Sequence, residues 1–367
     1  MESNTTKIYR AEKLFTGDGW LTGKAVVVAD GKIVEIISTD TVDQSLTIYP
    51  AIAPAFIDVQ IYGAHGKLLA VYPEADSLHK LYEYCKHGGA SHFQPTVATN
   101  SREVFYACID AVKNYWNEGG KGCLGLHIEG PWINAIKKGA HIESFIHSPS
   151  VDEVKELLAY GKDVITMITL APEVCSKEVV ELIGSYGVII SAGHSNATYK
   201  EATQAFNSGI HAATHLYNAM SPLQHRAPGM VGAVLDHATV MSSIVPDGFH
   251  VDFSAIRIAK KIMKERLFAI TDAVTETNEG PYLHHLTENK YEANGILSGS
   301  ALNMVKCLHN LIDHAEIDTA EALRMVSLYP AQVMNKASKM GKIEKGYDAN
   351  LVMLDEKLGV KKVIAAS

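Results

Sequence analysis

Residues 187–220, GVIISAGHSNATYKEATQAFNSGIHAATHLYNAM, contain two successive copies of one pattern. In each copy a short apolar run, first at 188–190 and then at 210–214, is followed by a histidine, His194 or His215. Both histidines therefore stand where a buried strand opens into a loop, and in a parallel α/β barrel such loops meet at one mouth. Either one alone fits an ordinary hydrogen-bonded loop histidine. The pair in successive units instead favours a transition-metal site.

The middle of the chain alternates between strand and helix patterns, which favours a parallel sheet with right-handed crossovers. A (β/α)8 barrel needs about 250 residues, so a chain of 367 residues has room for a barrel and a smaller module. We prefer the closed TIM-type barrel to an open sheet. Asp318, with Glu321 three residues later, predicts a capping box at the start of a late helix. The predicted strands are 54–63, 90–99, 124–128, 164–170, 188–190, 210–214, 240–245 and 267–271.

Both ends of the chain have short strand patterns with turns instead. Asp30-Gly31, between two apolar runs, is a strong hairpin signal. Because strand patterns at both termini flank the α/β middle, we predict that the two termini together form one small β-domain. The alternative is that they are two unrelated extensions of the barrel. We place the β-domain at residues 1–52 and 339–367 and the barrel at 53–338.

The net charge of the chain limits its binding partners, and its cysteines indicate the redox compartment. A net charge of −8 argues against non-specific nucleic-acid binding, but a local basic pocket still permits an anionic small substrate. The five scattered cysteines fit reduced thiols better than a disulfide framework. No segment resembles a signal peptide or a membrane span. We therefore expect a soluble cytoplasmic protein with no membrane partner.

Four polar residues end predicted strands: Glu129, His194, His215 and Asp272. One carboxylate and two imidazoles fill three positions around a Zn²⁺-like ion and leave one for water, which is the catalytic arrangement. Such an ion lowers the pKa of water towards about 7 and polarises a carbonyl. Asp272 is then suited to accept a proton from the water and return it to a leaving nitrogen. Either carboxylate alone fits a helix cap or a salt bridge, but the four together favour a site.

Six motifs add a resemblance to a known family. The chain from PAFIDVQ (54–60) to its end resembles the N-acetylglucosamine-6-phosphate deacetylase family of the amidohydrolase superfamily. The resemblance implies a (β/α)8 barrel, a small β-sandwich-like domain formed by both termini, and a cytoplasmic homo-oligomer, most often a dimer. The motifs are HIEGPW (127–132), SAGHSNATY (191–199), THLYNAM (214–220), DGFHVD (247–252), TDA (271–273) and NGILSGSAL (294–302).

The resemblance also implies roles for individual residues. Glu129, His194 and His215 become the metal ligands, Asp272 the acid/base, and His141 a neighbour of the acetyl carbonyl. Arg226, in the loop HRAPG, would hold phosphate together with His250; the alternative is a solvated loop arginine. The other implied substrate contacts are Ala140, Asn218, Ala219, Leu297, Ser298 and Gly299.

The chain departs from the superfamily pattern at residues that determine the number of bound metal ions. Many superfamily members have His-x-His after the first strand, whereas this chain has Gln60-Ile61-Tyr62. A carboxamide is a poor transition-metal ligand, so we expect one divalent ion per subunit and not a bridged pair. Zn²⁺ suits the ligands best, with Fe²⁺, Co²⁺ and Mn²⁺ as alternatives. Gln60 would instead hydrogen-bond the substrate or the water.

The expected reaction is hydrolysis of the acetamide of N-acetyl-D-glucosamine 6-phosphate to glucosamine 6-phosphate and acetate, through attack of a metal-activated hydroxide. The galactosamine epimer is an alternative substrate, and a catalytically silent binding module is an alternative of another class. A polar segment, 275–294, contains His284 and His285. It is either a lid or a surface loop, and we favour the surface loop.

Overall fold

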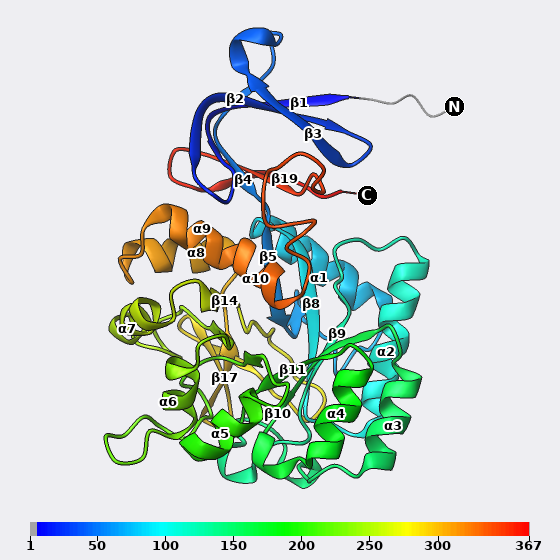
Figure 1. Ribbon diagram of the computed structural model, residues 1–367. Helices are drawn as coiled ribbons and strands as arrows, with labels where there is room; N and C mark the ends of the chain where they lie inside the picture. The colour runs from blue at the N-terminus through cyan, green and yellow to red at the C-terminus, as the bar shows by residue number, and fades with distance from the viewer. Residues whose placement is uncertain (1–5, 367) are drawn as a thin grey trace.

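An eight-stranded parallel sheet forms a nearly closed barrel (Figure 1). The structure is a computed structural model, and it describes residues 6–366. In sheet order the strands run consecutively from first to last, and the bridge Ile61↔Ala273 lies at the seam where they meet. The closed-barrel prediction is confirmed. The strands are β5 (Phe56–Ile61), β8 (Ala90–Ala98), β9 (Leu126–Glu129), β10 (Ile165–Leu170), β11 (Ile189–Ala192), β12 (Ala212–Ala213), β13 (Met241–Ile244) and β14 (Leu267–Ala269).

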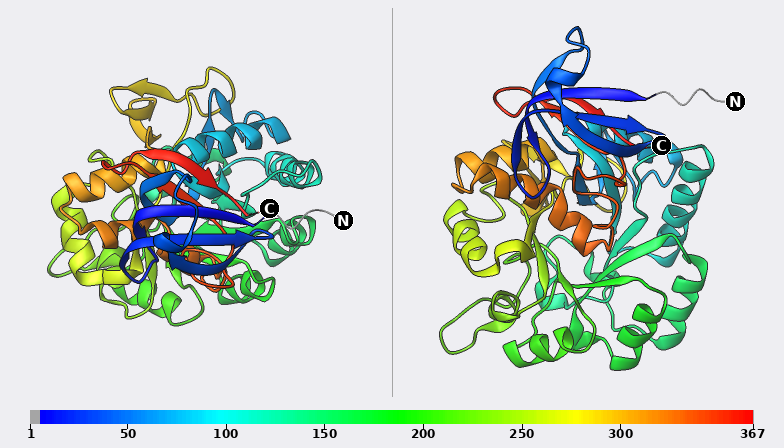
Figure 2. Two further views of the ribbon diagram at one scale, coloured as in Figure 1. Left: turned by 90° about the horizontal axis from the view of Figure 1, so that it is seen from above. Right: turned by 45° about the horizontal axis from the view of Figure 1, so that its top comes forward.

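Helices cover the outside of the barrel (Figures 1 and 2). Their apolar faces point inward, as in α2, where Phe105, Ile109 and Val112 are buried. None of the helices that the structure describes is long and apolar enough to cross a membrane. The helices are α1 (Ala75–His87), α2 (Arg102–Asn117), α3 (Val151–Tyr160), α4 (Lys177–Ser185), α5 (Tyr199–Phe206), α6 (Gly229–Asp236), α7 (Phe253–Met263), α8 (Met304–Asp313), α9 (Thr319–Val326) and α10 (Leu328–Val333).

Only half of the predicted capping box at α9 is present. The Asp318 side chain accepts hydrogen bonds from the backbone N–H groups of Ala320 and Glu321. The Glu321 carboxylate does not return to the cap, because it binds Lys260 Nζ at 2.5 Å and Arg324 Nη1 at 2.8 Å. Ion pairs with Lys260 of α7 and with Arg324 of α9 itself thus replace the second hydrogen bond of the box.

The two ends of the chain form one six-stranded sheet at one end of the barrel (Figures 1 and 2). Strand β18 pairs antiparallel with β4, so the alternative of two unrelated extensions is wrong. Since β4 leads almost directly into β5, we propose the division predicted above, at 52/53 and 338/339. In sheet order the strands are β19 (Val360–Ile364), β18 (Leu351–Leu354), β4 (Ile48–Pro54), β1 (Lys7–Phe15), β2 (Trp20–Ala29) and β3 (Lys32–Ser38).

A polar layer inside the barrel aligns the strands beneath its mouth. The His127 ring contacts Thr169 Oγ1 at 2.7 Å, and this hydroxyl contacts Thr214 Oγ1 at 2.7 Å. Ser191 Oγ lies 2.6 Å from the same Thr214 hydroxyl. These buried groups are hydrogen-bonded to one another, so the interior avoids the cost of unpaired polar atoms and links β9, β10, β11 and the end of β12.

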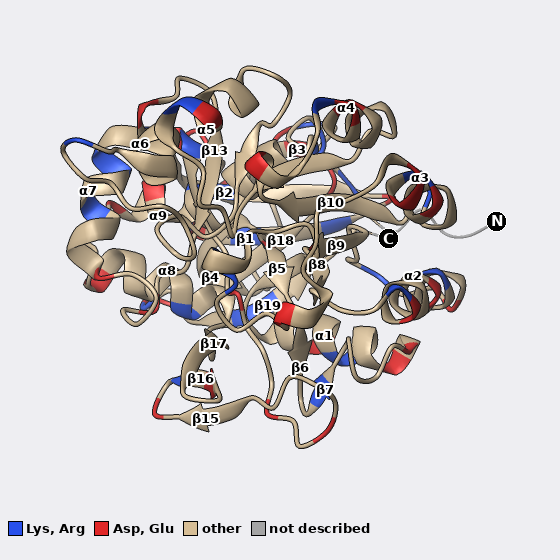
Figure 3. Cartoon of the chain, turned by 90° about the horizontal axis from the view of Figure 1, so that it is seen from below, with Lys and Arg blue, Asp and Glu red and all other residues tan. Residues whose placement is uncertain are grey.

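The segment that we expected to be a loop contributes to a third sheet. It lies beside the mouth of the barrel in the view from below (Figure 3) and contains β15 (His285–Thr287), β16 (Lys290–Ala293) and β17 (Ile296–Ser300). The bridge Ala273↔Ser300 joins it to the chain just after β14. Two shorter strands, β6 (Gly63–Ala64) and β7 (Lys67–Leu68), lie nearby (Figure 3).

Candidate metal-dependent active site

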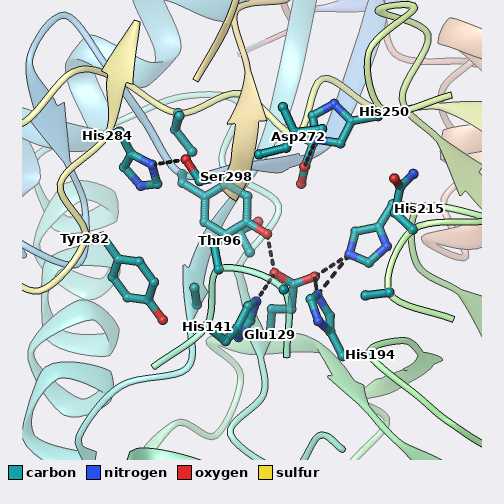
Figure 4. A pocket seen from close by; sticks show the side chains of 18 of the residues that line it. Thr96, Glu129, His141, His194, His215, His250, Asp272, Tyr282, His284 and Ser298 are labelled. Atoms are coloured by element: carbon teal, nitrogen blue, oxygen red, sulfur yellow. Dashed lines mark hydrogen bonds and ion pairs between the residues drawn. The ribbon is translucent and has the colours of Figure 1, made fainter. Parts of the chain in front are cut away.

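A cavity opens where the barrel strands end, and it brings the four predicted residues together (Figure 4). Glu129 is the last residue of β9, His194 and His215 follow β11 and β12, and Asp272 follows β14. All four side chains are buried but line the cavity.

Three imidazoles surround the Glu129 carboxylate. Oε1 lies 3.0 Å from His215 Nε2 and 3.4 Å from His194 Nε2. Oε2 lies 3.3 Å from His141 Nε2. The two Nε2 atoms of His194 and His215 are only 3.2 Å apart. Since the lone pairs of two neutral imidazoles repel at this distance, the arrangement favours a cation between them.

The outer ring nitrogen of His194 supports this interpretation. His194 Nδ1 donates to the carbonyl of Lys137 at 2.9 Å, which leaves the Nε2 lone pair facing Glu129, as in a typical metal ligand. His215 Nδ1 has no hydrogen-bond partner within residues 6–366. Glu129, His141 and His194 offer ligand atoms within 4.8 Å of one another. The sequence prediction had His215 in place of His141, and both sets share Glu129 and His194.

Burial and the neighbouring histidines have opposite effects on the pKa of the Glu129 carboxyl. Burial alone would raise the pKa of Glu129, but the three histidines around the carboxylate outweigh this effect and hold that pKa well below its usual value. Burial, with the neighbouring His194, lowers the pKa of His141 to about 4. An ionised carboxylate beside neutral imidazole is the donor set that Zn²⁺ and similar ions prefer.

Asp272 has a different electrostatic environment. Burial raises its pKa, although His215 and His250 oppose the rise. Its Oδ2 atom lies 3.7 Å from His250 Nε2, and His250 Nδ1 lies 2.6 Å from Asp247 Oδ2. A carboxyl with a raised pKa is suited to proton transfer near neutral pH.

Three of the four strand-end residues have left-handed backbone conformations, with φ of 47° at His194, 39° at His215 and 54° at Asp272. Such values are uncommon and costly for residues other than glycine, so the surrounding structure must hold them. The backbone N–H of His215 donates to Ser243 Oγ at 2.7 Å. The backbone of Asp272 is bonded on both sides, to Gln60 O at 3.0 Å and from Ser300 N at 2.9 Å.

The two polar side chains at the end of the first barrel strand, Gln60 and Tyr62, support the carboxylates. Gln60 Nε2 lies 2.9 Å from Asp272 Oδ1 and 3.2 Å from Glu129 Oε1. The Tyr62 hydroxyl donates to Glu129 Oε2. Among the described residues Gln60 does not line the cavity, so the structure does not support its predicted contact with the substrate.

Most of the other predicted contacts do line the cavity: Ala140, His141, Asn218, Ala219, His250, Leu297 and Ser298. In the described part of the chain, Gly299 and Arg226 do not. Arg226 is exposed and belongs to a separate surface groove, because a turn with hydrogen bonds between Gln224 and Ala227 directs it outward. Arg226 therefore lies away from the cavity of its own chain, and its contact with phosphate stays a prediction.

The cavity residues that the sequence analysis did not assign include Tyr282 and His284. Both are buried, so our interpretation of their segment as a surface loop is wrong at these positions. An aromatic residue and a histidine within a polar segment were the available signal. The order of polar and apolar residues in this segment does not indicate which side chains face inward.

The relatives of this chain are enzymes of one kind. A family model described as "Amidohydrolase family" matches residues 51–366. N-acetylglucosamine-6-phosphate deacetylase of Haemophilus influenzae is 36% identical over 309 residues, which cover 81% of this chain and 81% of the relative. N-acetylgalactosamine-6-phosphate deacetylase of Escherichia coli O157:H7 is 30% identical, with 98% of this chain and 97% of the relative covered.

A solved structure has the same fold. The crystal structure of N-acetylglucosamine-6-phosphate deacetylase from Pasteurella multocida superposes with a TM-score of 0.93 at 33% identity, and 99% of each chain is covered. The barrel and the terminal sheet are thus shared across the full length.

Proposed function

The chain belongs to the amidohydrolase family, and from this premise we propose that it hydrolyses the acetamide of N-acetyl-D-glucosamine 6-phosphate. The products are D-glucosamine 6-phosphate and acetate, a step of amino-sugar catabolism and recycling. The main support is the buried cluster around Glu129, which faces Asp272 across one cavity. The names of the relatives from Haemophilus influenzae and Pasteurella multocida supply the substrate.

We propose one divalent cation per subunit, held by Glu129, His194 and His215, with Zn²⁺ favoured and Fe²⁺, Co²⁺ or Mn²⁺ compatible with the donors. When bound, it would polarise the amide carbonyl and lower the pKa of water. His141, which contacts the other carboxylate oxygen of Glu129, would donate to the carbonyl oxygen. Ala140, Asn218, Ala219, Leu297 and Ser298 would enclose the sugar.

Asp272 performs both proton transfers. It accepts a proton from water as the oxygen attacks the acetyl carbon, and it gives that proton to the nitrogen as the carbon–nitrogen bond breaks. The Gln60 amide holds Oδ1 at 2.9 Å, which leaves Oδ2, 3.7 Å from His250 Nε2, for this transfer.

The phosphate group points to a dimer. A phosphate dianion is normally bound by arginine or lysine, yet within residues 6–366 no such side chain lines the cavity. We propose a homodimer in which the exposed Arg226 of one copy completes the phosphate site of the other, beside His250. The exposed Leu223, in the same loop, would lie in that interface. Light scattering of the purified protein measures the state, and a monomer would contradict the proposal.

We propose a cytoplasmic location because all five cysteines are free thiols.

The decisive experiment is acetate release from N-acetylglucosamine 6-phosphate, run beside the unphosphorylated sugar and the galacto epimer. We expect a strong preference for the phosphorylated gluco compound. The galacto epimer is the second candidate, since a relative that covers 98% of this chain bears that name. A preference for this epimer would change the sugar and keep the chemistry. Absence of turnover with all three would contradict the proposal.

A further inference from the structure

His284 is a cavity residue with no part in the chemistry proposed above. Its side chain is 4% exposed, and its Nδ1 atom lies 2.8 Å from Ser298 Oγ on β17. The other ring nitrogen, Nε2, makes no hydrogen bond in the part of the chain that the structure describes. The ring therefore has one nitrogen fixed by the protein and one available to a ligand.

A neighbouring tyrosine keeps this ring in place. The rings of Tyr282 and His284 are parallel within 8°, with centroids 6.0 Å apart. The Tyr282 hydroxyl donates to the carbonyl of Thr99 at 2.6 Å, and Thr99 Oγ1 lies 2.6 Å from His141 Nδ1. The segment is thus fastened to the end of β8 beside the Glu129 cluster. A polar group fixed in this way has already lost the freedom that binding would otherwise cost.

The position of His284 separates it from the reacting atoms. In Figure 4, Tyr282, His284 and Ser298 lie on one side of the cavity, whereas His194, His215 and Asp272 lie on the other. A substrate whose acetamide is held at the Glu129 cluster would present another part of its ring to His284.

We propose that His284 is a specificity residue whose Nε2 hydrogen-bonds one ring hydroxyl of the bound amino sugar. This inference rests on the proposed function. A hydroxyl is the fitting partner, because burial and the nearby His285 lower the pKa of His284 to about 4 and leave the ring neutral. A neutral imidazole donates or accepts one hydrogen bond, which suits a hydroxyl better than a phosphate dianion.

The adjacent histidine provides a matched control. His285 has the same chemistry but is exposed on β15. We expect His284→Ala to lower kcat/KM about 3- to 10-fold, the effect of one neutral hydrogen bond, mainly through KM. His285→Ala should leave both constants within about twofold of the wild type. Partial recovery in His284→Gln would indicate a hydrogen-bonding role.

Substrate analogues identify the hydroxyl. The wild type and His284→Ala are compared on N-acetylglucosamine 6-phosphate and on its 1-, 3- and 4-deoxy analogues. We expect one analogue to lose about 3- to 10-fold in kcat/KM with the wild type and to lose nothing further with His284→Ala. Thermal melting and metal content of each variant show whether the fold is kept.

The outcomes are distinguishable. If the wild type releases acetate and every analogue loses equally in both proteins, the role of His284 is wrong while the proposed function stands. If His284→Ala changes kcat and KM no more than His285→Ala does, the role is also wrong. A wild type with no deacetylase activity would overturn both proposals.

Discussion

The two walls of the cavity are built in different ways. The barrel wall contains Glu129, His194, His215 and Asp272, all at strand ends, and three of them have left-handed backbones. The hairpin wall contains Tyr282, His284 and Ser298, from the segment around β15–β17. The barrel wall is held by the backbone hydrogen bonds of the large sheet. The hairpin wall belongs to a sheet of only three strands, and its Tyr282 and His284 side chains are held by individual contacts.

This difference suggests a division of labour. Buried charged groups need a rigid frame, because a displaced and unpaired charge is costly. Neutral side chains that contact a sugar need less support, and they can change without disturbing the frame. We therefore expect substitutions in the barrel wall to affect turnover or folding strongly, and those in the hairpin wall to affect affinity moderately.

Asp272→Asn tests the barrel wall at its acid/base group and should have the largest effect. We expect kcat for acetate release to fall about 10²- to 10⁴-fold, the usual contribution of general acid–base catalysis. Metal content, measured by atomic emission, should be unchanged because Asp272 is outside the proposed ligands. Asp252→Asn, at the exposed N-cap of α7, is the control. Near-normal turnover in Asp272→Asn would refute the assigned role.

Asp58→Asn tests the seam between the first and last strands of the barrel, which supports the barrel wall. Asp58 is 1% exposed, and its Oδ2 accepts from Thr271 Oγ1 at 2.6 Å, joining β5 to the residue before Asp272. Burial raises its pKa to about 7, against the lowering effect of hydrogen bonds from Thr271.

A carboxyl with a raised pKa favours folding while it is protonated. Its contribution is complete below the unfolded pKa, near 4, and is lost as pH rises through 7. Between pH 5 and 8.5 this group should reduce the free energy of unfolding by roughly 2–3 kcal/mol. Urea unfolding should show a flatter pH dependence in Asp58→Asn. Equal slopes in the two proteins would contradict this account.

Gln60→Leu removes the amide that contacts both site carboxylates. We expect kcat to fall about 10- to 100-fold, as is common when a residue that orients a metal site is lost. Gln94→Leu is the matched control: Gln94 is also buried in the barrel, but its amide donates to Thr166 Oγ1 at 2.8 Å. Similar losses in the two variants would mean that general disruption of the barrel, and not the site, explains the effect.

Tyr282→Phe tests the hairpin wall and should have the smallest effect. It removes the hydrogen bond to the Thr99 carbonyl, worth about 1 kcal/mol, so we expect KM to rise a few-fold with little change in kcat. Hydrogen exchange should be faster at the amides of residues 282–286. Tyr72→Phe, which removes a hydrogen bond to Glu279 at 3.0 Å, should leave kinetics unchanged. A fall in kcat larger than the rise in KM would contradict the division between the walls.

The sequence predicted the barrel wall well, for a physical reason. A buried parallel strand is an apolar run of fixed direction, so a polar residue shortly after its end must lie at the mouth. Glu129, His194, His215 and Asp272 were found in this way. The terminal sheet was found from the strand patterns and turns at both ends.

The rest depended on contacts between distant residues. Tyr282 and His284 face the cavity because Thr99 and Ser298 hold them, and no local periodicity encodes such partners. The direction of Arg226 depends on how its loop turns, which residue type and spacing do not specify. Gln60 was predicted near the site, but its contact with two carboxylates required the geometry of the assembled barrel.

The order of the strands in the terminal sheet has a consequence for biosynthesis. Strand β18 lies between β19 and β4, yet about 300 residues separate it from β4 in the chain. At about 5–20 residues per second, a ribosome needs roughly 15–60 s to supply it. During that time β4 presents an unpaired edge to the other chains in the cell, which favours aggregation. The nascent protein should therefore be most dependent on chaperones shortly before its translation is complete.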